Sequence, residues 1–271
     1  MTILITGATG LVGARLLKRL AETGQSCRAL VRAGKPVPAS VDGVEGDLFD
    51  LASLATALRE VSAVIHLAAV FRTHDTDLIW KSNLEGTRNL IGAASQHAPQ
   101  ARFIMASTGN VYDRNCTHPS REDDEVHPEQ AYPASKIAAE KLLRESELNW
   151  SIVRLPFVYG DGDGHLQALP RYVKPFGFHP AHRMSTVHHR DVATAMRLAL
   201  EGRFDGQIVN ISDEAPTTVC ELVRLVDGAM EDSAEPLTDP WFLHMDGALA
   251  RKLGFQPEVR TVYQAAQEGL L

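Results

Sequence analysis

A glycine-rich turn near the start of the chain is the feature that most constrains its fold. Residues 6–13 read TGATGLVG, between a short apolar run and a stretch with helical periodicity. Glycines at this spacing let the chain turn tightly, let backbone N–H groups approach a pyrophosphate, and let the helix pack against a sheet. The sequence therefore predicts a strand–turn–helix unit that holds a dinucleotide through Gly7, Thr9, Gly10, Leu11, Val12 and Gly13.

Short β-branched runs alternate with helical stretches over the first 155 residues. The strand-like runs are nearly continuous in apolar residues, which is typical of strands buried on both faces. They lie at residues 2–6, 27–31, 63–67, 102–106 and 151–155. This alternation predicts an α/β fold, a Rossmann-type doubly wound parallel sheet.

The rhythm loosens after Leu155 into a Gly/Pro-rich region. We expect a small, discontinuous C-terminal substrate lobe to begin there, because Gln207 to Ile211 returns to a strand pattern that can rejoin the main sheet. The expected division is an NADP-binding domain of residues 1–156 plus about 186–211, and a lobe of residues 157–185 and 212–271.

Composition limits the classes of partner. The chain has 271 residues, 44% of them hydrophobic, and a net charge of −7, so it has a globular composition and no broad basic field for nucleic acid. Its longest apolar stretch, Val61 to Phe71, is shorter than the ~20 residues that span a bilayer. Three widely spaced cysteines and no visible signal peptide predict a soluble, cytoplasmic protein.

The end of the second predicted strand bears on the choice of dinucleotide. NAD-binding units place an acid about 20 residues past the glycines, where it binds the ribose 2′-OH. Here the strand ends at Arg32, and no acid occurs before Asp42. Arg32 and Lys35 suit a 2′-phosphate, so the sequence favours NADP(H) over NAD(H). The alternative is that both are solvated surface cations; Asp47, with Leu48 beside it, is a weaker candidate for adenine contact.

Tyr132 and Lys136 stand four residues apart at the start of a predicted helix and therefore share one face. A phenol with an ordinary pKa near 10 is a poor acid or base at neutral pH unless a cation stabilises its phenolate. Lys136 is placed to be that cation. Two hydroxyls, Ser107 and Thr108, end a further predicted strand, at the sheet edge where open α/β folds bind ligands.

These motifs occur together in an informative order. The segments are TGATGLVG, HLAA, NLEGTRNL, STGNVY, YPASK, RLPFVYG and STVHHRDVA. In this order they resemble the extended short-chain dehydrogenase/reductase superfamily, of the NAD-dependent epimerase/dehydratase type, over nearly the whole chain.

The resemblance implies roles for matching residues. Thr108 would hydrogen-bond the substrate oxygen, Tyr132 would donate or remove its proton, and Lys136 would bind the nicotinamide ribose and lower the tyrosine pKa. Asn83 would support the active-site water and the lysine. Ser107 would support the backbone near the nicotinamide. The resemblance also implies that Leu67, Ala68 and Ala69 lie along the cofactor, and that the segment from Pro156 to Val158 covers the nicotinamide. Relatives often dimerise through the two long helices, which predicts a homodimer.

The substrate lobe is short. Nucleotide-sugar enzymes of this type carry a longer insertion than residues 165–184 here, so we expect a compact, uncharged carbonyl or alcohol substrate. Aromatic residues that would line its pocket, or form the lobe's own core, are Phe157, Phe176, Phe178 and Trp241. Four histidines at positions 179, 182, 188 and 189 lack a zinc-type spacing, so no metal is expected.

The sequence thus predicts an NADP(H)-dependent oxidoreductase that transfers hydride between nicotinamide and a small carbonyl or alcohol, with Tyr132 as general acid/base. Two alternatives remain: a redox-neutral nucleotide-sugar epimerase or dehydratase, and a non-catalytic NADP(H)-sensing regulator.

Overall fold

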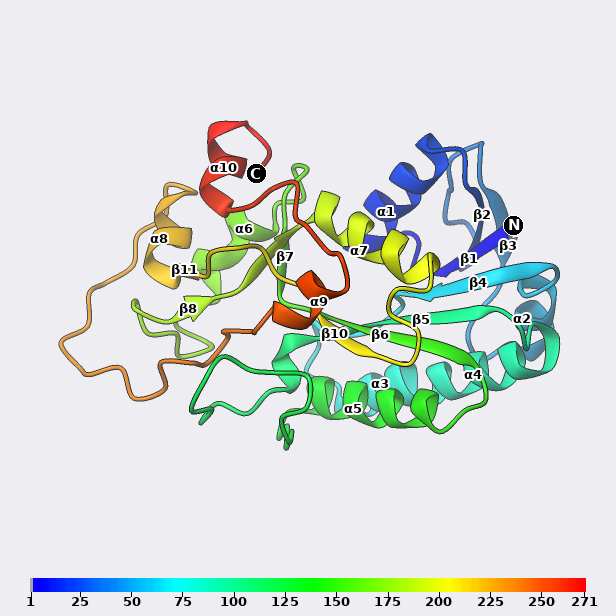
Figure 1. Ribbon diagram of the computed structural model, residues 1–271, viewed down its shortest axis with the longest axis horizontal. Helices are drawn as coiled ribbons and strands as arrows, with labels where there is room; N and C mark the ends of the chain where they lie inside the picture. The colour runs from blue at the N-terminus through cyan, green and yellow to red at the C-terminus, as the bar shows by residue number, and fades with distance from the viewer. Residues whose placement is uncertain (1) are drawn as a thin grey trace.

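A seven-stranded sheet forms the centre of the protein (Figure 1). The computed structural model describes residues 2–271. All neighbouring strands pair in parallel, in the order β10-β6-β5-β4-β1-β2-β3. This is a Rossmann arrangement and confirms the predicted fold class. The strands are β1 (Thr2–Thr6), β2 (Ser26–Val31), β3 (Asp42–Glu45), β4 (Val61–His66), β5 (Arg102–Thr108), β6 (Asn149–Leu155) and β10 (Ile208–Asn210).

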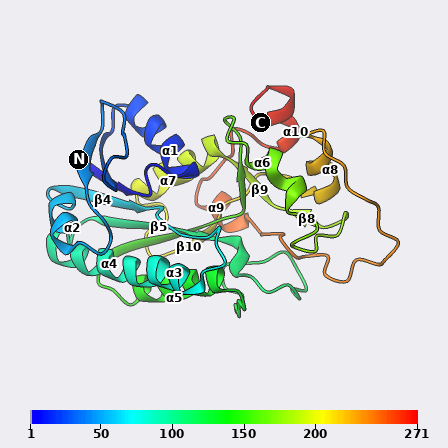
Figure 2. The ribbon, with the colours of Figure 1, turned by 180° about the vertical axis from the view of Figure 1, so that it is seen from behind.

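Helices cover both faces of this sheet, as Figures 1 and 2 show. α1 (Leu11–Glu22) and α7 (His189–Leu200) lie on one face, and α2 (Leu51–Ala57), α4 (Gly86–His97) and α5 (Ala131–Arg144) on the other. Each face has its own apolar core. In β1, Ile5 enters one core and Leu4 the other, and both are fully buried. Burial on both faces explains why the strands are almost continuously apolar.

The helical segment over residues 76–97 is interrupted by a wider turn. α3 (Thr76–Trp80) leads into a π-helical turn, Lys81–Glu85, and then into α4. A π turn accommodates an additional residue and is frequent at functional sites. It carries Asn83, whose side chain is buried.

The C-terminal elements lie beyond the carboxyl ends of the strands, at the opposite end of the molecule from the N-terminus (Figures 1 and 2). Their own apolar cluster includes Tyr159, Leu166, Leu222 and Val262. The elements are β7 (Phe157–Tyr159), α6 (His165–Ala168), β8 (Arg183–Met184), β9 (Thr186–His188), β11 (Thr217–Thr218), α8 (Val219–Arg224), α9 (Ala248–Lys252) and α10 (Val262–Gln267), with 3-10 turns at Gly109–Val111 and Leu169–Arg171. Within residues 2–271, no helix is both long and apolar enough to cross a membrane.

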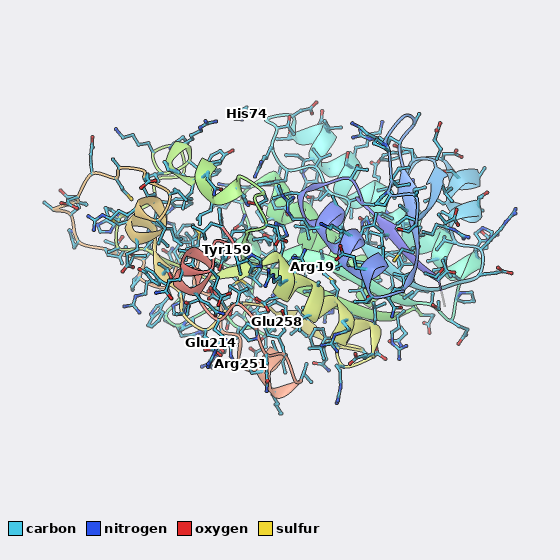
Figure 3. The ribbon with its side chains drawn as sticks, turned by 90° about the horizontal axis from the view of Figure 1, so that it is seen from above. Arg19, His74, Tyr159, Glu214, Arg251 and Glu258 are labelled. Atoms are coloured by element: carbon cyan, nitrogen blue, oxygen red, sulfur yellow. The ribbon has the colours of Figure 1, made fainter. Side chains whose placement is uncertain are left out.

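Two buried acids lie where α7 and β9 meet the C-terminal segments. Asp191 accepts hydrogen bonds from the backbone N–H groups of Glu258 (2.6 Å) and Val259 (3.1 Å). Asp213 accepts one from the Thr186 hydroxyl (2.5 Å). The carboxylates face Tyr159, which Figure 3 labels in the same region as Glu258 and Arg251. Burial raises the pKa of Asp191 to about 6 and that of Asp213 to about 7.

We predict that Asp213→Asn weakens the pH dependence of stability. The folded-state pKa of Asp213 is raised from 3.8 to about 7, so the folded protein binds this proton more tightly than the unfolded chain. Its contribution is complete below the unfolded pKa and is lost as the pH rises toward the folded one. The decrease in unfolding free energy from pH ~5 to ~8 should be smaller in the variant by about 2–3 kcal/mol.

Urea unfolding at the two pH values measures this difference. Asp232→Asn, which removes an exposed carboxylate, is the matched control. The same pH dependence in Asp213→Asn and in the wild-type protein would contradict the prediction.

Candidate active site

Four neighbouring strand ends meet at one edge of the sheet. Thr6 pairs with His66, His66 with Met105, and Thr108 with Leu155. The glycine turn, the segment after β4, the hydroxyl of Thr108 and the segment after β6 therefore follow adjacent strands at the same edge. Open α/β sheets bind their ligands at this edge.

The glycine turn forms a cradle with no room for side chains. Gly7 has φ +69°, and a Cβ built there would lie 2.6 Å from the backbone nitrogen of Ala68. A Cβ on Gly13 would overlap the carbonyl oxygen of Gly7, to which Gly10 donates its N–H at 2.9 Å. Gly10 caps α1 without a side-chain hydrogen bond, so in the described structure no capping side chain occupies the first N–H groups of this helix. This cradle fits a pyrophosphate.

The predicted adenosine-side residues lie on exposed turns. Arg32 directly follows β2, and its carbonyl accepts the N–H of Lys35 at 3.1 Å across a turn that contains Gly34 at φ +72°. Both cationic side chains are exposed. Asp47 accepts the N–H of Phe49 at 3.0 Å through one carboxylate oxygen, and the adjacent Leu48 is half-buried.

Thr108 and Tyr132 are brought together between β5 and α5. The Thr108 hydroxyl lies close enough to Tyr132 to affect the pKa of the phenol, and its oxygen accepts the N–H of Asn110 at 3.1 Å. Because α5 begins at Ala131, Tyr132 lies in its first turn and Lys136 one turn later. The Lys136 side chain is buried. Thr108 at the end of β5 and the two α5 residues Tyr132 and Lys136 thus come from adjacent elements.

The pKa values at this site differ from those implied by the resemblance. Burial raises the pKa of Tyr132 to about 12, and the group that opposes this rise is the Thr108 hydroxyl. Burial lowers the pKa of Lys136 to about 8, and the carboxylate of Glu140 opposes that decrease. A lowering of the tyrosine pKa by Lys136 is therefore not what the structure shows, since desolvation dominates both groups.

Lys136 neighbours a buried ionic network that sequence reasoning missed. Arg154 donates to Glu140 at 2.7 and 3.2 Å, and both side chains are almost fully buried. Ser107 donates its hydroxyl to the same carboxylate, and Tyr112 accepts from Arg154 at 2.9 Å. The Ser107 hydroxyl, expected near the nicotinamide, is thus already paired. The available signal was Arg154, the one charged residue of the buried strand β6.

Asn83 is also more constrained than expected. Its amide oxygen accepts the N–H of Val70 at 2.8 Å, and its amide nitrogen donates to the Val70 carbonyl at 2.9 Å and to the Ser135 hydroxyl at 3.0 Å. Ser135 in turn donates to the Tyr132 carbonyl at 2.7 Å. Asn83 therefore ties the segment after β4, which holds Leu67, Ala68 and Ala69, to the first turn of the helix that carries Tyr132.

Aromatic rings border Tyr132. Phe71, another residue that sequence reasoning missed, has its ring centroid 5.0 Å from that of Tyr132, and the Arg72 guanidinium lies 5.2 Å from the Phe71 centroid. Phe157, between Pro156 and the buried Val158, stacks on His165 at 4.2 Å. Desolvation by burial lowers the pKa of His165, and the positive charge of Arg72 lowers it as well.

The other aromatic candidates and the histidines have structural partners. Phe176 and Phe178 stack at 5.7 Å, and Trp241 lies 5.5 Å from His244. His182 is hydrogen-bonded to the carboxylate of Asp239, and His189 to that of Asp163, both at 2.8 Å. The ring of His188 accepts the backbone N–H of Arg190 at 3.1 Å. Among the described residues, no group of three or more His, Cys, Asp or Glu side chains is arranged to hold a metal.

Comparisons with known proteins agree with this geometry. The model of the NAD dependent epimerase/dehydratase family matches residues 3–212. A 4-hydroxy-2-methyl-3-oxo-4-farnesyl-3,4-dihydroquinoline-1-oxide ketoreductase of Stigmatella aurantiaca is 28% identical over 246 residues, 83% of this chain and 72% of that protein.

Two solved structures are also similar. A short-chain dehydrogenase/reductase superfamily protein of Agrobacterium tumefaciens with bound NAD has a TM-score of 0.82 and 25% identity, covering 99% of this chain and 95% of the other. MoeE5 in complex with UDP-glucose and NAD has a TM-score of 0.71 and 28% identity, covering 83% and 81%. A nicotinamide dinucleotide is therefore supported as the cofactor.

We predict that Gly7→Ala lowers dinucleotide affinity at least about tenfold, because the methyl group requires a strained φ and also overlaps the backbone at Ala68. Gly24→Ala is the matched control, since Gly24 has φ +78° and nothing within 4 Å of a built Cβ. Calorimetric titration with the dinucleotide measures both variants. Equal affinity losses in the two would show that the close approach to Ala68 is not what matters.

Proposed function

This chain belongs to the NAD dependent epimerase/dehydratase family, and we propose that it is an NADP(H)-dependent oxidoreductase acting on a small carbonyl or alcohol. The observation that carries this proposal is the placement of Thr108 beside Tyr132, at the sheet edge that also holds the glycine cradle, with the buried Lys136 one turn further along α5. A positioned acid and a hydroxyl beside a dinucleotide site are what carbonyl reduction requires.

A nicotinamide dinucleotide, held by Gly7, Gly10 and Gly13 of the cradle, would provide the hydride donor or acceptor when bound. Thr108 hydrogen-bonds the substrate oxygen and orients it toward the phenol. Tyr132 donates the proton to a carbonyl oxygen, or removes it from an alcohol. Lys136, held partly protonated by Glu140 near neutral pH, provides positive charge beside the developing charge on oxygen. Phe71 covers one side of Tyr132 and limits access of water to it.

The pKa of Tyr132 determines its protonation state. With a value of about 12, the phenol is protonated at neutral pH, the form that donates a proton to a carbonyl oxygen. Carbonyl reduction is the type of reaction named for the Stigmatella relative.

The preference for NADP(H) rests on Arg32 and Lys35. Both are exposed cations just beyond β2, where an acid for the ribose 2′-OH of NAD is missing. A guanidinium binds phosphate oxygens through two parallel hydrogen bonds. The similar solved structures named above contain NAD, so this preference is a property proposed for this chain alone.

We predict that Arg32→Asp reverses the dinucleotide preference. Loss of charge-assisted hydrogen bonds should weaken NADPH binding between about tenfold and 100-fold, while the new acid can accept from the 2′-OH of NADH. Fluorescence titration with each reduced dinucleotide measures the two Kd values. Arg59→Gln, which removes another exposed arginine, serves as the control. Equal wild-type affinities for NADPH and NADH would refute the proposed preference.

The proposed substrate is compact and uncharged. The segment between β7 and β9 is short, and much of it is taken up by α6, a 3-10 turn and β8. The competing function is redox-neutral conversion of a nucleotide sugar, the ligand class named for MoeE5. A non-catalytic sensor would have no need of the Thr108–Tyr132 pair.

We predict that Tyr132→Phe lowers kcat by at least about 100-fold, because it removes the proton donor. The Kd for the dinucleotide should remain unchanged, since the phenol oxygen is not part of the cradle. Absorbance of NADPH during carbonyl reduction measures kcat, and Tyr172→Phe, a change in the C-terminal lobe, is the matched control. Full activity in the Tyr132→Phe variant would show that Tyr132 is not the proton donor.

Two further proposals concern assembly and location. α3 and α5 lie on the same side of the sheet (Figure 1). Leu78 and Trp80 of α3 have exposed apolar side chains. We propose a homodimer through this face. We also propose a cytoplasmic location, because Cys27, Cys116 and Cys220 are free thiols.

A further inference from the structure

A series of hydrogen-bonded, buried polar side chains joins the glycine turn to α5, the helix that carries Tyr132. Its centre is His66, the last residue of β4, which is fully buried. The Nδ1 atom of His66 lies 2.6 Å from the hydroxyl oxygen of Thr6, the residue before Gly7. Its Nε2 atom lies 2.8 Å from the hydroxyl oxygen of Thr87, in the first turn of α4. Both threonines are also buried.

Counting protons determines the tautomer of this ring. The Thr87 hydroxyl donates its only proton to the carbonyl of Asn83 at 2.6 Å, because a carbonyl can only accept. Thr87 must therefore accept from His66, which places the proton of the imidazole on Nε2. Nδ1 is then an acceptor for the Thr6 hydroxyl, whose oxygen lies 3.5 Å from the N–H of Ala68.

The electrostatic surroundings agree with a neutral ring. Burial, together with the positive charge of Lys136, lowers the pKa of His66 to about 3. A neutral imidazole has one donor and one acceptor, and both are used here. A buried polar chain in which every member is paired fixes its geometry, whereas an unpaired member would be costly.

The chain continues through Asn83 to the reacting region. The side chain of Asn83 clamps both backbone groups of Val70 and donates to Ser135, which donates to the carbonyl of Tyr132. The backbone of Asn83 is held by Thr87, and Thr87 is held by His66. One imidazole thus links the cofactor cradle, the wall after β4 and the first turn of α5.

We propose that His66 is a positioning residue that, as a neutral ring protonated on Nε2, aligns Asn83 and through it Val70 and Tyr132. Its kinetic consequence rests on the proposed function, whereas its tautomer and its effect on Val70 do not. No atom of His66 touches the substrate in this account, so its influence on turnover is entirely through geometry.

The first test reads the tautomer by NMR of ¹⁵N-histidine-labelled protein. We expect a protonated Nε2 and an unprotonated Nδ1 for His66, with no titration between about pH 5 and about 8. Thr87→Val removes the acceptor at nearly constant volume and should change these resonances, while Thr87→Ser should restore them. A proton on Nδ1 in the wild-type protein, or titration in this range, would overturn the proposal.

The second test reads positioning. Thr87→Val should accelerate hydrogen exchange of the Val70 amide at least about tenfold, because its acceptor on Asn83 becomes less well fixed. It should also lower kcat between about tenfold and 100-fold at an unchanged Kd for the dinucleotide. Thr87→Ser should recover both. Val209→Ala, which creates a cavity at the distant strand β10, controls for a general loss of stability.

The outcomes separate this inference from the proposed function. If the wild-type protein reduces no carbonyl, the proposed function fails, and the exchange of Val70 still decides the positioning role. Unchanged exchange at Val70 in Thr87→Val would overturn that role, as would normal kcat in an active protein. If Val209→Ala changes the exchange of the Val70 amide and kcat equally, His66 contributes only to general stability and the proposal fails.

Discussion

The contact between the glycine turn and the end of β4 is the constraint on which the rest of the site depends. Gly7 lies against the backbone of Ala68 so closely that no side chain fits between them. Gly13 lies still closer to Gly7, which brings the start of α1 next to the sheet edge. The N–H groups at the start of this helix are thereby exposed at that edge, a geometry that suits a pyrophosphate. The hydrogen bonds of Thr6 and His66 reinforce the same junction from inside the fold.

Electrostatic balance around Lys136 is the second determinant. Desolvation alone would favour a neutral amine, and the nearby carboxylate of Glu140 counteracts this effect. Glu140 is itself compensated by Arg154, since an isolated buried charge would cost several kcal/mol. The buried Arg154–Glu140 pair thus places a compensated carboxylate where it favours the charged form of Lys136. The neutral ring of His66 adds no further positive charge there.

Much of the fold and part of the site can be predicted from sequence because they depend on local spacing. The Gly7–Gly13 pattern, the apolar strands and the separation of Tyr132 and Lys136 are local features, and the parallel sheet follows from the alternation of strands and helices. The pKa values do not follow, because burial, which spacing does not reveal, outweighs the effect of the Thr108 hydroxyl on Tyr132 and that of the Glu140 carboxylate on Lys136.

Long-range pairings were the other part that sequence could not provide. The partnership of Glu140 with Arg154 and the contact of Phe71 with Tyr132 join residues from separate elements. The π turn around Asn83 is also invisible to helical periodicity, because the same apolar face continues through α3 and α4. These features set the side-chain environment of the reacting groups, and they emerge only when the elements are packed together.

The most direct measurement of the central claim is the redox balance of the reaction. The wild-type protein would be incubated with NADPH and a panel of small ketones and aldehydes, with nucleotide sugars as controls, while the absorbance of the reduced dinucleotide is followed. The account predicts stoichiometric oxidation of NADPH with at least one small carbonyl and none with a nucleotide sugar. Conversion of a nucleotide sugar with no net change in absorbance, and no consumption of NADPH with any carbonyl, would contradict it.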